Sequence, residues 1–371
     1  MADNFDAASA AQAALSAEAG DGSEAEQLAI EARMYSLHIE QAARDKIAAE
    51  SAPVIPDFTA GADFLAQTDP EPPWRIHGLW PAGGNVVLSA QFKAGKTTLR
   101  DNLIRCWCDG APFLGRYEIT PTGGRIAVID AEMPRTMARR WLNAQRIADA
   151  GRFAYVNIRG GAAAFNMLVP TVRGEWVKRL VGAGAAGLLL DCLGPVLAAL
   201  GLDENSGADV GRFIAGFEQM LAAAGIPESM VIHHMGHSAE RSRGASRLRD
   251  WPDAAWQLVR QDDNPASARY LSAFGRDVDM PESRLDYDPS NRWLTLAGGS
   301  RSEEQIRAAR GALTDFLTGN PESSYRAIEA ALAEEHPRQA IRRAIKAAVA
   351  DGAVLTRGGP RNAILHWLAP S

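Results

Sequence analysis

Residues 85–104 contain the feature that most constrains this chain, because a buried strand, a loop of small residues and a helix follow one another directly. The segment reads NVVLSAQFKAGKTTLRDNLI. Residues 86–88 predict an apolar strand, and the run GKTT at residues 95–98 opens the helix. In this order the N–H groups of the loop and the positive end of the helix dipole can surround a phosphate group. The segment therefore predicts a phosphate-binding loop (P-loop).

The chemistry of such a loop assigns a role to its residues. Lys96 is expected to reach the β- and γ-phosphates of a nucleoside triphosphate, and the Thr97 hydroxyl is expected to ligate Mg²⁺. Ala90 stands where these loops usually begin with glycine, and its one added methyl group is a small change that the loop should tolerate. The expected nucleotide-binding residues are Ala90, Lys93, Ala94, Gly95, Lys96, Thr97 and Thr98. The predicted cofactors are ATP and Mg²⁺.

Length, charge and cysteine content limit the remaining possibilities. A chain of 371 residues with 46% hydrophobic composition can form one large α/β core and a smaller module. Its net charge of −6 argues against a simple basic nucleic-acid coat protein, although a local basic loop is compatible with it. Cys106, Cys108 and Cys192 form no disulfide framework, and Cys106 and Cys108, a C-x-C pair in a predicted helix, are expected to be packed core thiols. No membrane span or signal peptide is predicted, so the expected compartment is the reducing cytoplasm.

Residues 1–74 are expected to form a region of their own before the core. Residues 1–22 are rich in Ala, Ser, Gly and acids, which predicts disorder. Residues 24–50 predict an amphipathic helix, and the prolines of residues 51–74 predict a linker or arm. The helix could dock on a neighbouring subunit or lie solvated on its own subunit, and the sequence leaves both readings open.

Strands and helices alternate through residues 75–300, which is typical of a doubly wound α/β domain. Strands are expected at residues 86–88, 126–129, 153–157, 186–191 and 229–234, with helices at 135–148, 173–182 and 208–224. Later strands at 256–259, 269–274 and 293–296 are expected to be antiparallel at a sheet edge. Ligands of such sheets bind beyond the carboxyl ends of the strands, so Lys96, Glu132, Asp191 and His234 are expected to cluster there.

Three strand ends carry candidate catalytic groups. Asp191 ends the apolar run LLLD, where a Walker B carboxylate would hold the water shell of Mg²⁺ opposite Thr97. Glu132 could orient and deprotonate the attacking water, although an acid in the first turn of a helix is the alternative. His233 and His234 end the next strand. His234 is expected to sense the γ-phosphate through a donated hydrogen bond, while His233 packs, since strand residues alternate faces.

Basic residues after these strands are candidates for contacts with DNA or with a neighbouring subunit. The segment 236–250 is expected to contact a phosphate backbone, although a solvated loop paired with Glu240 and Asp250 is the alternative. Arg276 could reach the γ-phosphate of a neighbouring subunit as an arginine finger. The expected DNA-binding residues are Arg241, Arg243, Arg247 and Arg249.

Residues 301–371 predict a separate small domain. Three helices are expected, at residues 302–318, 325–335 and 338–351, followed by two short strands around residues 357–360. Three helices closed by a hairpin is the winged-helix pattern, and a small helical cap is the alternative. The module could bind duplex DNA or dock a replication protein, and both possibilities stay open.

The motifs AQFKAGKTTL, IDAEMP, LLLDCL, VIHHMGH and RSRGASRLRDWPDAAW resemble, in this order, the RecA/DnaB-type ATPase superfamily. They are closest to RepA-like hexameric helicases of plasmids and phages. The resemblance covers about residues 75–296. It implies a RecA-like ATPase domain with Glu132 as catalytic glutamate, a sensor pair in His233 and His234, and Arg276 as a finger acting on the adjacent subunit. It also implies a hexameric ring that acts on single-stranded DNA in replication or recombination.

One departure from the family leaves the function open. The lysine that the family places after the histidine strand is not obvious here, since His237 and Ser238 occupy that stretch. A helicase loader or recombination mediator that hydrolyses ATP without unwinding is the first alternative. A DNA-binding regulator that uses the C-terminal module, with ATP as a switch, is the second.

Overall fold

The computed structural model describes residues 22–50, 56–68, 74–235, 247–262, 264 and 267–370. The chain divides into two compact units, residues 1–68 and 69–371. The first 21 residues, for which disorder was expected, lie outside the described part. None of the described helices is long and apolar enough to cross a membrane.

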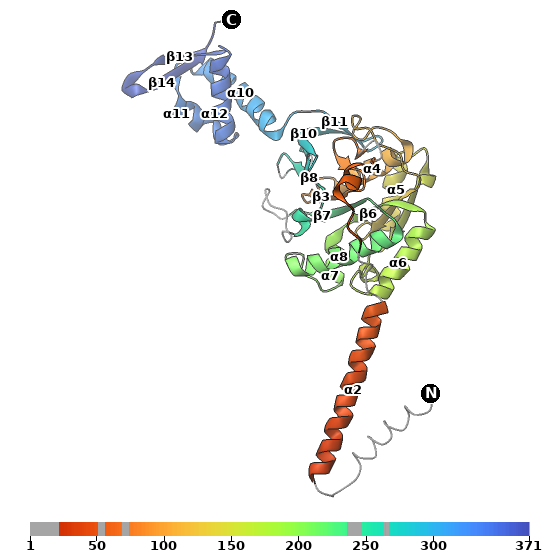
Figure 1. Ribbon diagram of the computed structural model, residues 1–371. Coiled ribbons are helices and arrows are strands. Elements are labelled where there is room, and N and C mark those ends of the chain that lie inside the picture. Colours follow the sequence, from red (N-terminus) through yellow and green to blue (C-terminus); the bar gives the residue numbers. More distant parts are fainter. Residues whose placement is uncertain are drawn as a thin grey trace. The chain divides into compact units, whose positions relative to one another are not determined.

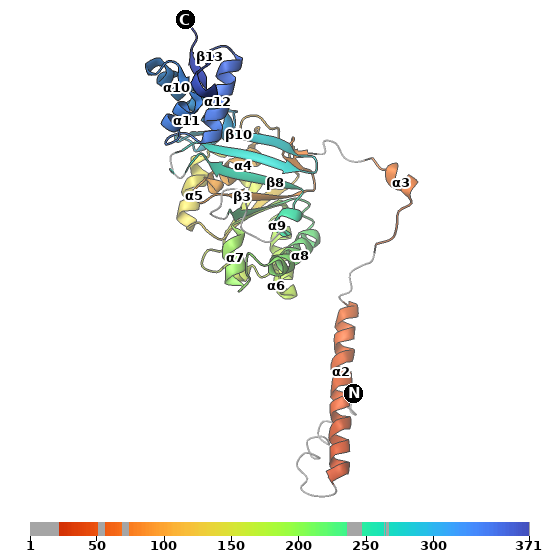
Figure 2. The same ribbon diagram turned by 90° about the vertical axis from the view of Figure 1, so that its left-hand side faces the viewer.

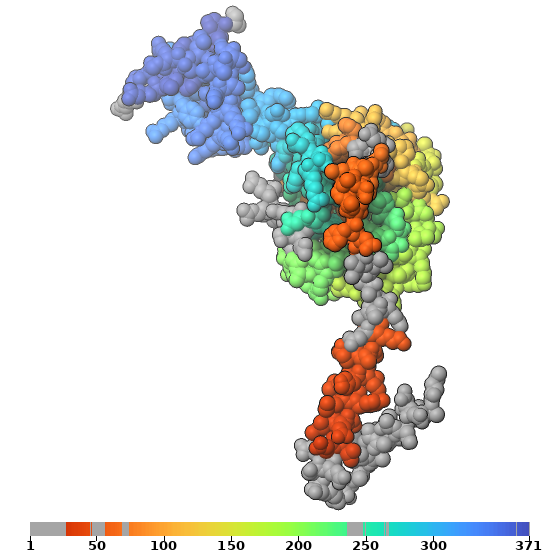
Figure 3. All heavy atoms as spheres, in the orientation of Figure 1, coloured from red at the N-terminus to blue at the C-terminus, as the bar shows by residue number. Residues whose placement is uncertain are grey.

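The first unit contains the helix predicted near residue 24 and one short helix. Helix α2 spans Gly22–Glu50, and α3 spans Gly61–Leu65 within the proline-rich stretch. The large apolar side chains described on α2 are exposed within this unit. They are Leu28, Ile30, Met34, Tyr35, Leu37 and Ile39. Figure 3 draws the described atoms of this helix in red.

A nine-stranded sheet forms the centre of the second unit. Its strand order is β11-β10-β9-β8-β3-β7-β6-β4-β5, and all neighbours from β8 to β5 are parallel. The parallel strands are β3 (Asn85–Ala90), β4 (Arg125–Asp130), β5 (Phe153–Asn157), β6 (Ala185–Asp191), β7 (Ser229–His234) and β8 (Ala254–Arg260). The antiparallel strands are β9 (Arg269–Gly275), β10 (Asp279–Asp288) and β11 (Trp293–Leu296). A mixed α/β unit with a mainly parallel central sheet fits the expected RecA-like fold.

The antiparallel edge differs from the expectation in two respects. β8 was expected to be antiparallel, but it pairs in parallel with β3, and the antiparallel part begins only at β9. β10 was not predicted as a strand, because its sequence DMPESRLDYD contains a proline and mostly charged or polar residues. Such residues are tolerated where a strand lies near the edge of a sheet and faces solvent.

Helices cover both faces of the sheet. Helix α4 (Lys96–Asp109) and α5 (Arg135–Ala144) share a core with Val86 and Leu88 of β3. Val87, on the opposite face of the same strand, joins a second core. The helices that contribute to this second core include α6 (Pro170–Gly182), α7 (Leu193–Ala199) and α8 (Gly207–Ala224). Figure 2 shows these three helices together on one side of the sheet. A short hairpin of β1 (Trp74–Ile76) and β2 (Trp80–Pro81) precedes β3.

Residues 301–370 fold around a core of their own, as Figure 1 shows in blue. The helices are α10 (Arg301–Gly319), α11 (Tyr325–Leu332) and α12 (Arg338–Ala350). A three-stranded antiparallel sheet, in the order β12-β14-β13, joins β12 (Ser323–Ser324), β13 (Val354–Gly358) and β14 (Ile364–Leu368). The chain order is therefore helix, strand, two helices and two strands. The three helices expected from the sequence are confirmed, and β12 is an addition to the expected hairpin.

Helix α8 approaches the segment before α6 so closely that Gly216 is required there. A β-carbon on Gly216 would overlap the carbonyl oxygen of Met167, whereas Gly174 on α6 has open space around it. We expect Gly216→Ala to destabilise the fold by about 1–3 kcal/mol through overpacking. Gly174→Ala should stabilise it by up to about 1 kcal/mol, because alanine is the better helix former. Urea unfolding measures both values, and equal stability of the two variants would refute this packing.

Candidate active site

The loop between β3 and α4 has the backbone that a phosphate-binding loop needs. Gly95 caps α4 with φ 99°, a left-handed conformation that favours glycine. Ala90 is the last residue of β3, an extended position that alanine adopts freely. Its carbonyl oxygen accepts the N–H of Met235 at 2.8 Å. The missing first glycine is therefore no obstacle to this loop conformation.

A pocket of about 390 Å³ opens beside this loop at the carboxyl ends of the parallel strands. Its volume lies within the range of about 300–1,000 Å³ that is usual for small-molecule sites. Its walls come from the P-loop, the ends of β4 and β7, helix α5 and the antiparallel edge. The lining residues are Phe92, Lys93, Gly95, Lys96, Thr97, Thr98, Glu132, Met133, Trp141, His234, Arg269, Tyr287, Arg292 and Leu294.

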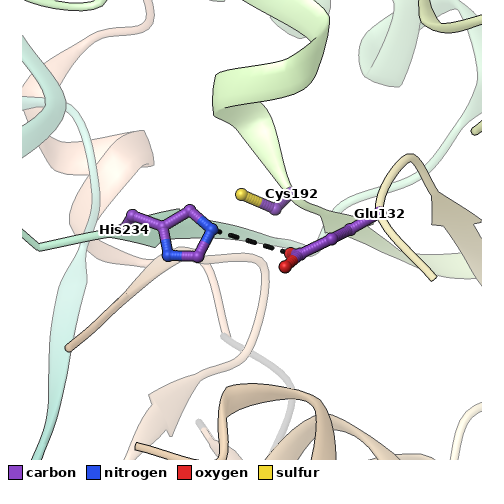
Figure 4. A group of neighbouring side chains, drawn as sticks. All are labelled: Glu132, Cys192 and His234. Carbon is purple, nitrogen blue, oxygen red and sulfur yellow. Dashed lines mark ion pairs between the residues drawn. The ribbon is translucent and has the colours of Figure 1, made fainter. Parts of the chain in front are cut away.

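Lys96, Glu132 and His234 meet in this pocket, as the strand order predicts. The Lys96 ammonium lies 2.5 Å from a Glu132 carboxylate oxygen and 3.1 Å from His234 Nε2. The same glutamate oxygen lies 3.7 Å from His234 Nε2 (Figure 4). His234 and then Lys96 lower the pKa of Glu132 to about 2, against the opposing effect of burial. Glu132 is therefore ionised at neutral pH, as a general base must be.

The turn after β4 holds Glu132 in position. Asp130 ends β4, and its Oδ1 accepts the backbone N–H groups of Glu132 at 3.0 Å and Met133 at 2.8 Å. The other oxygen of Asp130 accepts a hydrogen bond from the Tyr155 hydroxyl at 2.9 Å. Because Asp130 is fully buried, the backbone of this turn has little freedom to move. The direction of the glutamate thus depends on a carboxylate two residues earlier.

A buried guanidinium connects the P-loop helix to two strand ends. Arg100 lies one turn after Lys96 in α4, and its Nη1 donates to Asp130 and Asp191 at 2.8 Å each. Its Nε and Nη2 donate to Asp101 at 3.0 and 2.8 Å. Burial alone would lower the pKa of Arg100, but the three carboxylates, Asp101 first, raise it overall. Arg100 therefore stays charged and aligns β4 and β6 with α4.

Thr97 and Asp191 are suited to hold Mg²⁺. One oxygen of Asp191 binds Arg100, and the other is buried and accepts no hydrogen bond from any described residue. A hard cation with its water shell is a suitable partner for such an oxygen. Thr97 opens α4 with its side chain at the pocket wall. When bound, Mg²⁺ would neutralise charge on the phosphates of the nucleotide.

The far wall of the pocket presents flat side chains. The Arg292 guanidinium stacks on the Trp141 ring at 3.8 Å and donates to the Thr98 hydroxyl at 3.0 Å. Tyr287, at the end of β10, is 41% exposed and also lines the pocket. Aromatic rings and guanidinium planes are surfaces on which a nucleobase can stack. This wall is thus suited to the base, and the P-loop to the phosphates.

Arg269 is a further cation in the pocket wall. It begins β9, and its Nε donates to the carbonyl oxygen of Ala94 at 3.0 Å. A β-carbon on Gly95 would lie 3.4 Å from that same Nε. Arg269 therefore supports the P-loop from the antiparallel edge and places positive charge beside the expected phosphates.

Arg276 does not join the pocket of its own chain. It follows the end of β9 and pairs with Asp253 at 2.9 Å. The other oxygen of Asp253 accepts the N–H of Asn85, at the start of β3. The P-loop follows the carboxyl end of β3, whereas Asn85 is at its amino end. Arg276 therefore lies near the amino ends of the parallel strands, away from the pocket. Its action as a finger on a neighbouring subunit stays a prediction.

The expected DNA-binding loop is described only at its end. Arg241 and Arg243 lie outside the described residues. Arg247 and Arg249 belong to the short helix α9 (Arg247–Asp250), in which their side chains lie outside the described part. Their contact with DNA stays a prediction. His233 is buried, as expected for the member of the histidine pair that packs. The three cysteines are free and buried, which confirms the expectation of packed thiols for Cys106 and Cys108.

Six site residues were missed by the sequence reasoning: Arg100, Asp130, Trp141, Arg269, Tyr287 and Arg292. A signal existed for the first two. The charged pair Arg100-Asp101 lies in the helix after the P-loop, where a buried charge needs a partner. Asp130 precedes Glu132 by two residues in the same motif. The other four depend on long-range contacts, and no local pattern indicates them.

The P-loop, the ionised glutamate and the aspartate at the neighbouring strand end together define a P-loop ATPase. The chain belongs to the family described as AAA domain (AAA_25), whose model matches residues 50–240. No curated protein matches the chain. Among solved structures, a KaiC-like protein from the hyperthermophilic archaeon Pyrococcus horikoshii is similar at 15% identity and a TM-score of 0.43. The similarity covers 60% of this chain and 93% of that protein.

Lys96 and Glu132 should fail in different ways when they are changed. Lys96→Ala removes the ammonium group that is expected to bind the phosphates, so it should abolish nucleotide binding or turnover. Glu132→Gln keeps the shape but loses the base, so ATP should bind while turnover falls by about 10²-fold or more. Fluorescent-nucleotide binding and phosphate release measure the two effects. Glu175→Gln, on the exposed surface of α6, is the matched control. A normal rate for Glu132→Gln would place the base elsewhere.

Loss of the Arg100 bridge should be costly, because three carboxylates would lose their shared cation. We expect Arg100→Met to lower the free energy of unfolding by about 3–5 kcal/mol. The matched control is Arg212→Met, since Arg212 forms an exposed pair with Asp209 on α8 and the loss of a solvent-screened pair should cost little. Denaturant unfolding compares the two variants. A similar small loss for both would show that the buried bridge does not stabilise the fold.

Proposed function

We propose that this chain is a DNA-dependent ATPase of the RecA/RepA type, which assembles as a ring and acts as a motor or helicase in phage or plasmid DNA replication or recombination. The observation that carries the ATPase part is the meeting of Lys96, Glu132 and His234 in one pocket beside the P-loop. A phosphate cation, a general base and a sensor are the groups that triphosphate hydrolysis and its signalling require.

The present contacts indicate what nucleotide binding would change. Lys96 pairs with Glu132, so the ammonium is not directed at a phosphate and the carboxylate is not available to a water molecule. A triphosphate in the P-loop offers Lys96 several anionic oxygens, which draw the ammonium towards the phosphates. Glu132 then becomes free to accept a proton from the attacking water. His234 is a neighbour of both groups and could report the presence of the γ-phosphate to β7.

The C-terminal module supports the DNA part of the proposal. Its order of helix, strand, two helices and two strands is compatible with a winged helix, in which the third helix would lie in the major groove. The third helix here, α12, carries four exposed cations: Arg338, Arg342, Arg343 and Lys346. Lys and Arg side chains on one helix can neutralise DNA phosphates. Docking of a replication protein on the same face is the rival role.

Two parts of the proposal rest on the sequence resemblance. They are the hexameric ring and the binding of DNA in its central channel. Two features are compatible with assembly. The Arg276 side chain is 78% exposed near the amino ends of the parallel strands, where a neighbouring subunit could contact it. The described apolar side chains of α2 are exposed within their own unit and could be covered by another copy.

The basic face of α12 also favours one alternative, an ATP-switched DNA-binding regulator. A regulator would bind one duplex sequence through residues 301–371 and would not unwind a fork. A loader or mediator would hydrolyse ATP without unwinding and without that sequence preference. Unwinding of a forked duplex distinguishes the motor from both alternatives, and footprinting on duplex DNA identifies the regulator.

Charge removal on α12 tests the DNA role. We expect Arg342→Ala with Lys346→Ala to weaken duplex binding and to lower the slope of log K against log salt by about 2, since each phosphate contact contributes about 0.9. Basal ATPase should persist. The matched control is Lys178→Ala with Arg179→Ala, which removes the same charge from exposed α6. Fluorescence anisotropy across a salt series measures both. Equal affinity and slope for the two double variants would contradict DNA binding by α12.

A further inference from the structure

Three side chains of the kinds that bind transition metals converge beside the P-loop from three neighbouring strand ends. Glu132 follows β4, Cys192 follows β6 and His234 ends β7. One ligand atom from each lies within 4.8 Å of the other two. Figure 4 shows the glutamate carboxylate facing the imidazole, with the thiol next to both. The pocket chemistry proposed above uses Glu132 and His234 but gives Cys192 no role.

Thiolate, imidazole and carboxylate are the donors that Zn²⁺ prefers, with bonds of about 2.0–2.3 Å in a tetrahedral arrangement. Donor atoms in such a site lie roughly 3.3–3.8 Å apart. The present spread is larger by about 1 Å, which small side-chain rotations can close. Glu132 and His234 are only partly buried and can make this movement, whereas Cys192 is fully buried and fixed.

We propose that Glu132, Cys192 and His234 form an inhibitory site for a soft divalent transition-metal ion of the Zn²⁺ type. The inference rests on the proposed role of Glu132 in hydrolysis. A bound ion occupies the carboxylate that would take the proton of the attacking water, so turnover stops. On binding, the Cys192 S–H bond breaks, the sulfur keeps the electron pair and binds the ion, and the proton leaves to solvent.

Lys96 determines when the ion can enter. Its ammonium lies between Glu132 and His234, at 2.5 and 3.1 Å, and two cations cannot share that space. Phosphates in the P-loop draw Lys96 away, which opens the position. The ion and ATP therefore bind together, and the ion lowers kcat without raising KM for ATP. The fourth coordination position is open towards the pocket, because Glu132 and His234 line the pocket and Cys192 lies behind them.

Cys192 separates this site from the Mg²⁺ site. Mg²⁺ prefers oxygen ligands and is a poor partner for sulfur. An ion that merely replaces Mg²⁺ at Thr97 and Asp191 would inhibit without any dependence on Cys192. The cysteine is thus the residue on which the test should turn.

The experiment titrates Zn²⁺ into the full chain with excess Mg²⁺-ATP and compares each variant with its own metal-free rate. Cys192→Ala removes one ligand, and Cys106→Ala removes another buried free thiol, on α4, as the matched control. We expect wild type and Cys106→Ala to lose kcat at the same Zn²⁺ concentration. Cys192→Ala should need at least about 10-fold more Zn²⁺, since loss of even a hydrogen-bond partner of a metal ligand typically costs about 10–100-fold in affinity and a lost ligand should cost no less.

Cobalt binding gives a readout that does not depend on activity. Co²⁺ added with a non-hydrolysable ATP analogue should produce a thiolate-to-metal charge-transfer absorption in wild type and Cys106→Ala, and not in Cys192→Ala. Equal Zn²⁺ inhibition of Cys192→Ala, or no such absorption in wild type, overturns the site. If wild type shows the absorption but hydrolyses no ATP, the metal site stands and the proposed ATPase function fails. If ATP is hydrolysed but neither metal effect is seen, the proposed ATPase function stands and the metal site fails.

Discussion

The buried guanidinium of Arg100 is the contact on which the arrangement of the active site depends. It belongs to the helix that the P-loop opens, and it donates to Asp130 and Asp191 at two neighbouring strand ends. Asp130 in turn holds the backbone turn that directs Glu132. The P-loop, the carboxylate suited to hold Mg²⁺ and the proposed general base are thereby linked through one side chain. A buried charge without partners is costly, so these groups keep their relative positions before a nucleotide arrives.

A second constraint is the balance of charge in the pocket. Lys96 and Glu132 neutralise each other at 2.5 Å, and His234 lies beside both. This ion pair holds both side chains in place, but it also keeps the Glu132 carboxylate bound to Lys96 and unavailable to water. In the proposed mechanism, an anionic triphosphate resolves this state, because its phosphates compete for Lys96 and leave Glu132 ionised next to the γ-phosphate. The same release opens the position for an inhibitory metal ion, with Cys192 behind it.

The parts of this account that the sequence predicted are those in which local pattern and chemistry coincide. The P-loop, the apolar strands that end in Asp191 and His234 or lead into Glu132, and the three C-terminal helices each have a signature within a few residues. Their clustering followed from the rule that parallel strands place their carboxyl ends at one edge. Arg292 and Arg269 could not be predicted, because their roles depend on how the antiparallel edge folds against α4 and α5. Arg276 was expected to act on a neighbouring subunit, and its pairing with Asp253 places it near the amino ends of the parallel strands, away from the pocket of its own chain.

A crystal structure with Mg²⁺ and a non-hydrolysable ATP analogue tests the central claim most directly. The account predicts that the Lys96 ammonium leaves Glu132 for the β- and γ-phosphates, while Arg100 keeps its contacts with Asp130 and Asp191. Glu132 should then face the γ-phosphate through one water molecule. A structure in which the analogue is bound while Lys96 still pairs with Glu132, or in which Glu132 points away from the γ-phosphate, would contradict the account.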